Sequence, residues 1–202
     1  ERPSMDKVIV PTTWREIGIG VSGRFDGLSL RYQAYLFNGF LSHDGEEGKL
    51  KGSSGLRGGR QKGAESVVDQ FNLSAKLDYY GIPNLRLGLS GYSGRTQAVD
   101  GQNAIPGSDV GVAMLGLDAR FKWQNLSARG QFVHASLSDT DAYNTLTGRD
   151  LGSALGGFYV ETAYNLLPLT NRQRLDAFVR YENYDTHKNV GTSIVKNPAF
   201  DR

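Results

Sequence analysis

Eight stretches of the sequence alternate between apolar and polar residues at every second position, and this pattern restricts the fold more than any other feature. Alternation with a period of two is typical of β-strands, whose side chains point in turn to the two faces of a sheet. The stretches span about residues 15–24, 28–37, 71–80, 85–93, 112–123, 126–135, 157–165 and 174–183. The sequence therefore predicts an all-β chain, with residues 1–202 as a single domain.

The connections between these stretches alternate between short and long. Short turn signals rich in Gly, Pro and Asn, such as 81–84 and 123–125, follow every other stretch. The remaining connections are long and polar, near 38–70, 94–111 and 136–156. This order predicts an antiparallel up-and-down sheet with tight turns at one end and large loops at the other. Loops of this length usually carry function.

The two faces of the predicted sheet differ in charge. One face consists of aliphatic, aromatic and small residues, and none of its residues in the eight stretches is charged. The opposite face carries fourteen charged residues, namely Glu16, Arg24, Arg31, Lys76, Asp78, Arg86, Asp118, Arg120, Lys122, Arg129, Glu161, Asp176, Arg180 and Glu182. One face is therefore suited to an apolar environment and the other to water.

Aromatic residues on the apolar face lie at both ends of the strands and leave an aliphatic belt between them. They are Phe71, Phe132, Phe158 and Tyr181 beside the long loops, and Tyr79, Phe121, Trp123 and Tyr164 beside the short turns. Two such bands are typical of the outward face of a barrel that crosses a bilayer, and strands of about ten residues match a tilted crossing. We therefore expect a transmembrane β-barrel, with a soluble β-sandwich as the alternative.

The composition agrees with this expectation and excludes several other classes. Lys and Arg number 23 against 21 Asp and Glu, so the formal charge is only +2, and no nucleic-acid partner is expected. The chain has no cysteine, which excludes disulfides and thiolate metal sites. The 26 glycines and a mean hydropathy of −0.41 fit a barrel with a charged face toward water.

Three segments, "VIVPTTWREIGIGVSG", "LSLRYQAYLFNGF" and "GLRGGRQKG", resemble segments of bacterial outer-membrane porins of the phosphate-selective porin O and P family. The resemblance implies a barrel of about 16–18 strands, often trimeric, in the outer membrane of a Gram-negative bacterium. The sequence shows neither a leader pattern nor the terminal aromatic strand of that family, so we expect an internal portion of a larger barrel. A closed eight-stranded barrel with a salt-bridged interior is the alternative.

The inward face supplies the first set of candidate site residues. Basic residues slightly outnumber acidic ones there, and rings of Arg and Lys favour anions in water-filled pores. The candidate pore-lining residues are Arg31, Lys76, Arg86, Arg120, Lys122, Arg129 and Arg180. Under the alternative interpretation, these charges pair across neighbouring strands and only keep the interior wet.

The second candidate set is the basic loop from Lys49 to Gly63. It contains five cations and no acid, namely Lys49, Lys51, Arg57, Arg60 and Lys62. A phosphate-binding P-loop is excluded because no Ser or Thr follows a Gly-Lys pair and no helix pattern begins. Two interpretations stay open, a loop folded into the barrel mouth as a constriction and a solvated surface loop. The flanking acids Asp44, Glu46, Glu47 and Glu65 would dilute its charge.

No motif in the sequence indicates an enzyme, a metal site or a cofactor. The three histidines show no ligand spacing and no G-x-S-x-G elbow occurs, although composition alone does not exclude a lipase-type triad. We expect a passive diffusion channel for small anionic or neutral solutes, surrounded by outer-membrane lipid and lipopolysaccharide and assembled as a homotrimer. The alternatives are a non-conducting structural or adhesive barrel and a soluble β-barrel carrier.

Overall fold

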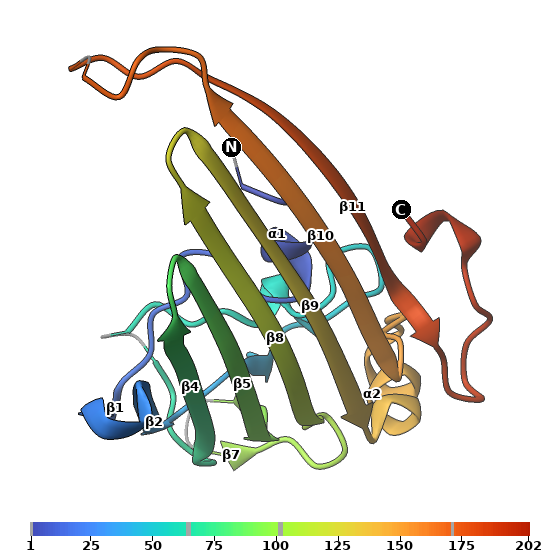
Figure 1. Ribbon diagram of the computed structural model, residues 1–202. Coiled ribbons are helices and arrows are strands. Elements are labelled where there is room, and N and C mark those ends of the chain that lie inside the picture. The colour runs from blue at the N-terminus through green and yellow to red at the C-terminus, as the bar shows by residue number, and fades with distance from the viewer. Residues whose placement is uncertain (1, 64–65, 101–102, 171) are drawn as a thin grey trace.

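The computed structural model describes residues 2–63, 66–100, 103–170 and 172–202, and it is dominated by one antiparallel sheet (Figure 1). Strand content is 53% and helix content 11%. Eight strands follow one another in chain order. They are β1 (Gly18–Phe25), β2 (Leu30–Phe37), β4 (Asn72–Ile82), β5 (Leu85–Arg95), β8 (Gly111–Trp123), β9 (Leu126–Ser138), β10 (Ala154–Asn165) and β11 (Asp176–Asn189). The prediction of an antiparallel, up-and-down β fold is confirmed.

The short connections lie at one end of the sheet, as the sequence predicted. Residues 83–84 join β4 to β5 and residues 124–125 join β8 to β9. Asn84 (φ 66°) and Gln124 (φ 50°) adopt the left-handed conformation that such two-residue turns require. A short 3-10 helix, η1 (Asp26–Leu28), joins β1 to β2. The connection from β10 to β11 spans 166–175 and is longer than predicted; residue 171 lies outside the described residues.

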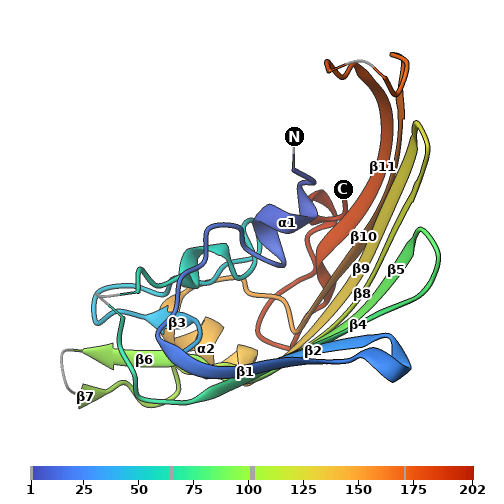
Figure 2. The same cartoon turned by 60° about the vertical axis from the view of Figure 1, so that its left-hand side comes forward.

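The sheet is strongly curved, and the helices and long loops lie on its concave side (Figure 2). Strands β1 and β11 form its two edges and do not pair with each other in the described part of the chain. The sheet is therefore open, unlike the closed eight-stranded barrel that the sequence left as an alternative. No described helix is long and apolar enough to span a membrane.

The segments outside the eight strands contain structure that the sequence did not predict. The additional elements are α1 (Met5–Val8), β3 (Leu41–His43), the 3-10 helix η2 (Arg57–Gly59), β6 (Gln97–Asp100), β7 (Asn103–Ala104), α2 (Thr140–Thr147) and the 3-10 helix η3 (Pro198–Phe200). Strand β3 pairs in parallel with β6, and β6 pairs with β7, so the first two long loops share a small sheet of their own. Helix α2 comes from the third long loop.

The apolar core lies on the concave side at the long-loop end. Inner-face residues such as Tyr92, Val133 and Tyr159 pack there against residues of the loops, including Leu50 and Leu56. The alternation in the sequence does not reveal this apolar zone, because these inner-face positions have the same phase as the charged residues. The concave face is thus divided along the strands into a covered apolar zone near the loops and a charged zone near the short turns.

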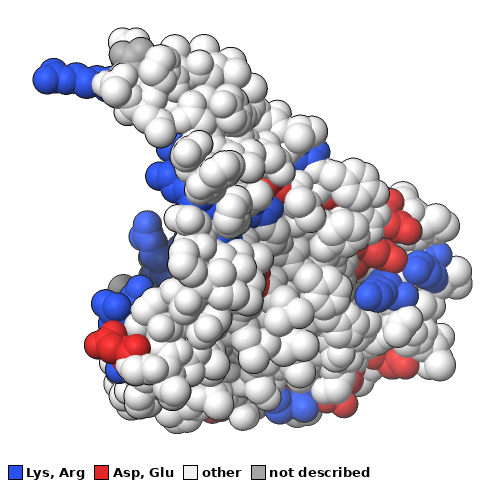
Figure 3. All heavy atoms as spheres, viewed as in Figure 1, with Lys and Arg blue, Asp and Glu red and all other residues white. Residues whose placement is uncertain are grey.

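The convex face remains bare. Its apolar side chains are well exposed, for example Ile19 at 75%, Trp123 at 54% and Leu117 at 49%. Figure 3 looks onto this face, where uncharged atoms dominate and Lys, Arg, Asp and Glu gather toward the margins. The face that the sequence predicted to be apolar is therefore the outer face of the curved sheet, and no described segment covers it.

Candidate functional site

Cross-strand register places a row of charged residues across the concave face near the short turns. Arg86, Arg120, Arg129, Glu161 and Arg180 occupy directly paired positions on β5, β8, β9, β10 and β11. Because each is the partner of the next, five neighbouring strands present four guanidinium groups and one carboxylate side by side. The strands thus bring four of the predicted pore-lining residues together with Glu161, although all five are scattered in the sequence.

Glu161 is the counter-ion within this row. Its Oε1 accepts a hydrogen bond from Arg129 Nε at 2.7 Å, and its Oε2 accepts bonds from Arg129 Nη2 at 3.0 Å and Arg180 Nε at 2.8 Å. One carboxylate thus binds two guanidinium groups, which leaves an excess of positive charge. Bonds of this charge-assisted kind hold their partners in fixed geometry.

A second cluster lies next to this row. Asp118 Oδ2 is 2.7 Å from Lys76 Nζ, and Asp118 Oδ1 is 3.2 Å from Arg86 Nη2. Asp78 lies 3.6 Å from Lys76 and 3.7 Å from Arg86. Two acids and two bases therefore neutralise one another, which is the cross-strand pairing that the sequence left open for the inward charges.

The other predicted wall cations have no such partner. Among the described residues, Arg31, Arg120 and Lys122 are exposed and take part in no side-chain hydrogen bond or ion pair. A hollow of about 500 Å³ is lined by Arg120 and Lys122 together with Arg86, Arg129 and Glu161. Cations without counter-ions in a concave, partly enclosed surface raise the local concentration of anions.

The basic loop is folded onto the concave side of the sheet. Leu50 and Leu56 are fully buried and Gly59 is buried. Arg57 Nη1 donates to the backbone oxygen of Lys7 at 3.1 Å. Arg60 Nη1 donates to the backbone oxygen of Thr12 at 2.6 Å. Arg57 thus ties the loop to α1 and Arg60 ties it to the segment that follows α1, and their charges meet no carboxylate in these contacts.

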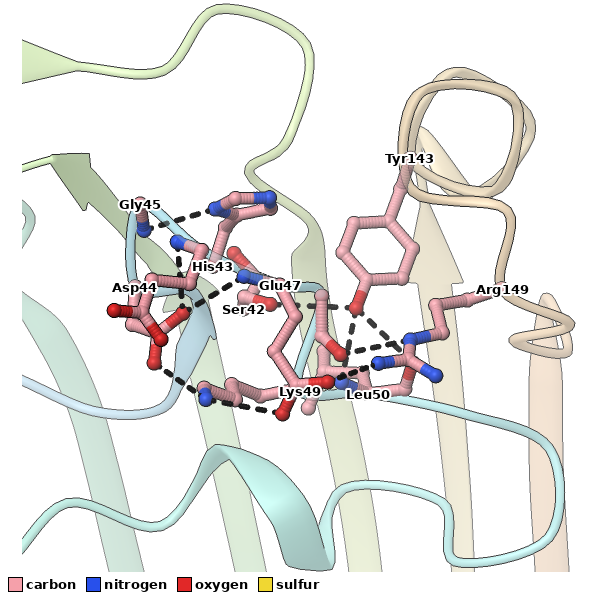
Figure 4. Close-up of polar contacts among 11 residues, drawn as sticks. Ser42, His43, Asp44, Gly45, Glu47, Lys49, Leu50, Tyr143 and Arg149 are labelled. Atoms are coloured by element: carbon pink, nitrogen blue, oxygen red, sulfur yellow. Dashed lines mark hydrogen bonds and ion pairs between the residues drawn. The ribbon is translucent and has the colours of Figure 1, made fainter.

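The remaining loop cations differ in environment. Lys49 forms ion pairs with Asp44 and, at 3.2 Å, with Glu47 (Figure 4), so two of the flanking acids do reduce the charge of the loop, as the sequence suggested. Lys51 and Lys62 are exposed. Glu65 lies outside the described residues.

The ion pairs and the packing shift the pKa values of these loop residues. Burial acts to raise the pKa of Asp44, but the Lys49 ammonium and the backbone N–H groups of Glu46 and Glu47 bring it to about 2. The hydrogen bond to Asp44 raises the pKa of Lys49. Burial, together with the nearby charge of Arg57, lowers the pKa of Arg60. The Lys49–Asp44 pair therefore stays charged through the whole neutral range.

Buried side-chain amides fix both ends of the 38–70 connection, which contains the basic loop. Asn72 Nδ2 donates to the backbone oxygen of Asn38 at 2.8 Å and to that of Arg95 at 2.9 Å. Gln61 Nε2 donates to the backbone oxygen of Gly39 at 2.8 Å, and Gln61 Oε1 accepts from the Val67 N–H at 2.7 Å. Because these groups are neutral and buried, salt does not screen their bonds. They belong to no recognisable motif, so no signal in the sequence indicates their role.

Among residues 2–63, 66–100, 103–170 and 172–202, no group of three His, Cys, Asp or Glu side chains could hold a metal ion. His187 is buried; its Nδ1 accepts from the Asn197 N–H at 3.1 Å, so Nε2 donates to the Asp150 backbone oxygen at 2.6 Å. These two hydrogen bonds fix the His187 ring among the loops on the concave side, which indicates a structural role.

Comparisons with known proteins give one relative and no function. No family model matches the chain, and no solved structure matches it. An uncharacterized protein of Aquifex aeolicus (strain VF5) is 34% identical over 210 residues. The match covers 97% of this chain and 45% of that protein, so the chain spans less than half the length of the relative.

Proposed function

We propose that the chain forms part of the wall of an outer-membrane porin, a passive diffusion channel with a weak preference for anions. The observation that carries the proposal is the arrangement of the sheet's two faces. The convex face is apolar and exposed, with aromatic residues at both strand ends, whereas the concave face carries the charged row. A soluble barrel carrier requires the reverse, an apolar interior and a polar exterior.

Strand length and the sheet edge support a larger barrel. Strands β4, β5 and β8 to β11 have 11 to 14 residues, enough for the roughly 9–11 residues of a tilted crossing. Beyond η3, Arg202 exchanges two backbone hydrogen bonds with Tyr184 of β11, at 2.7 and 2.9 Å. The chain therefore begins to pair again along the outer edge of the sheet, as it would where a further antiparallel strand is added.

The proposal also covers the anion preference, the surroundings, the assembly and the solutes. Unpaired wall cations such as Arg120 and the charges of Arg57 and Arg60 supply the anion preference. Membrane lipid and lipopolysaccharide would cover the convex face. We further propose kinship with the phosphate-selective porin O and P family and a trimeric assembly. The solutes are small, hydrophilic and either anionic or neutral, and they pass without chemical change.

The two tryptophans allow a direct test of the membrane orientation. Trp123 lies exposed on the convex face at the short-turn end, whereas Trp14 is half-buried and stacks on Phe40 at 4.0 Å. In vesicles of brominated phosphatidylcholine, we expect Trp123 emission to be quenched in a Trp14→Phe variant. Trp14 emission in a Trp123→Phe variant should stay bright. Equal emission of Trp123 in brominated and ordinary lipid would contradict the proposal.

A non-conducting barrel is the second candidate, and the packed loop favours it, because Leu50, Leu56 and α1 fill the loop end of the concave side. Conductance of the full-length protein in a planar bilayer separates the two functions. We expect discrete unitary steps with a larger permeability for chloride than for potassium. A full-length protein that inserts but shows no unitary steps would leave the structural or adhesive function.

A further inference from the structure

Helix α2 contacts the basic loop at the base of a small hairpin, residues 42–50. Tyr143 of α2 is fully buried. Its hydroxyl oxygen accepts a hydrogen bond from the Leu50 N–H at 2.9 Å, and its proton can be donated to the backbone oxygen of Leu50 at 3.0 Å or of Ser42 at 3.3 Å. One hydroxyl group thus joins both strands of the hairpin, as Figure 4 shows.

Arg149, which follows α2, binds the same hairpin beside its tip. Its Nε donates to the backbone oxygen of Gly48 at 2.9 Å, and its Nη2 lies 2.6 Å from Glu47 Oε2. The approach of α2 is close: a Cβ atom at Gly48 would lie 2.7 Å from the Tyr143 hydroxyl oxygen and 2.8 Å from Thr147 Cβ. Only glycine fits there without displacing the helix.

We propose that Tyr143 and Arg149 are positioning residues that hold the basic loop across the pore. The inference rests on the porin function proposed above and adds the part that fixes the loop. The hairpin leads directly into Lys49 and Lys51, whereas the buried amides fix the loop only near its two ends. Without Tyr143 and Arg149, the hairpin of residues 42–50 loses its hydrogen bonds to the α2 region, although Gly52 keeps its bonds to Asp150 and Thr186. The hairpin then moves into and out of the solute path.

The test uses the folded full-length protein with Tyr143→Phe, which keeps the aromatic ring and removes only the hydroxyl group. Limited trypsin digestion in detergent should release peptides ending at Lys49 and Lys51 about tenfold faster than in the wild type, because local opening costs less once these hydrogen bonds are lost. Single-channel recordings should show added current fluctuations. Tyr184→Phe is the matched control, because the hydroxyl of this buried tyrosine makes no hydrogen bond to any described residue; its digestion and current should match the wild type.

If Tyr143→Phe does not fold, Arg149→Gln removes the neighbouring contacts from a more exposed position, and the same faster cleavage is expected. Unchanged cleavage in the folded variant, in a protein that conducts, overturns the positioning role alone. A wild type that never conducts overturns the proposed function, and the positioning role in a pore with it. The two failures are distinguishable because proteolysis does not depend on conduction.

Discussion

At the scale of single residues, Glu16 is the group whose titration should affect stability near neutral pH. It precedes β1, its Oε1 accepts a hydrogen bond from Trp14 Nε1, and its buried Oε2 has no hydrogen-bond partner among the described residues. Burial raises the pKa of Glu16 from 4.5 to about 7, and the bond from Trp14 opposes this only in part. The folded state therefore keeps a proton that the unfolded chain loses at lower pH.

The sign of the pH dependence follows from this shift. The stabilising effect of the protonated form is complete below about pH 4.5 and is lost as the pH rises through about 7. Glu16→Gln mimics the protonated form and should raise the melting temperature at pH 8 but leave it unchanged at pH 4. Melting curves between pH 4 and 9, with exposed Glu46→Gln as the control, measure this. Equal melting temperatures of wild type and Glu16→Gln at pH 8 would contradict it.

Arg120 offers the cleanest residue-scale test of anion preference, because removing it breaks no ion pair among the described residues. Arg120→Gln should lower the chloride-to-potassium permeability ratio about twofold by weakening the field of the wall. Reversal potentials in a salt gradient measure the ratio. Arg120→Lys keeps the charge and should keep the ratio. A ratio that falls equally in both variants would show that shape, not charge, is responsible.

At the scale of elements, the strands were predictable and the loops were not. A strand with one apolar face shows its period directly in the sequence, so β4, β5 and β8 were located to within about two residues. Helices α1 and α2 have only 4 and 8 residues, too few to show a periodic apolar stripe in the sequence. For Arg57 and Arg60 the sequence left open a constriction loop and a solvated surface loop, and it did not indicate that they bind backbone oxygens of a segment about fifty residues earlier. Such long-range partners leave no local signal.

Because buried side-chain amides bind both ends of the 38–70 connection, we expect this connection to unfold together with the long-loop end of the sheet. Gln97, at the start of β6, accepts from the N–H groups of Asp69 and Gln70 at 2.6 and 2.7 Å, and donates to the Gln70 backbone oxygen at 2.7 Å. Gln97→Leu would leave these groups unpaired and should lower the free energy of unfolding by about 2–4 kcal/mol.

Chemical denaturation in detergent provides the measurement for Gln97→Leu, and the neighbouring Gln70→Leu is the control. The Gln70 side chain is exposed, and its one described hydrogen bond, to Asp69 at 3.4 Å, is long. That variant should therefore change stability by less than about 0.5 kcal/mol. Similar losses in both variants would show that the Gln97 bonds do not fix the loop.

At the scale of the whole molecule, the concave face is divided into two zones. A single curved sheet can therefore carry both an apolar core and a charged surface that faces water. Near the loops, residues such as Tyr92 and Val133 bury loop side chains and form the core; near the short turns, the same face carries the charged row. Alternation along each strand fixes which residues share a face, but not which part of that face is covered. That division arises from loops folding back, and it becomes visible only in the structure.

The convex face carries the last prediction, which concerns depth in a bilayer. Leu117 lies at the middle of β8 and Ala113 near its loop end, and both are exposed on this face. In a membrane, arginine costs about 2–4 kcal/mol at the midplane and about 0–1 kcal/mol near the interface. Leu117→Arg should therefore destabilise the protein folded in phosphatidylcholine vesicles by several times more than Ala113→Arg, as measured by urea-dependent unfolding. In water, arginine at either exposed position would cost little, so equal and small effects would place the convex face outside the bilayer.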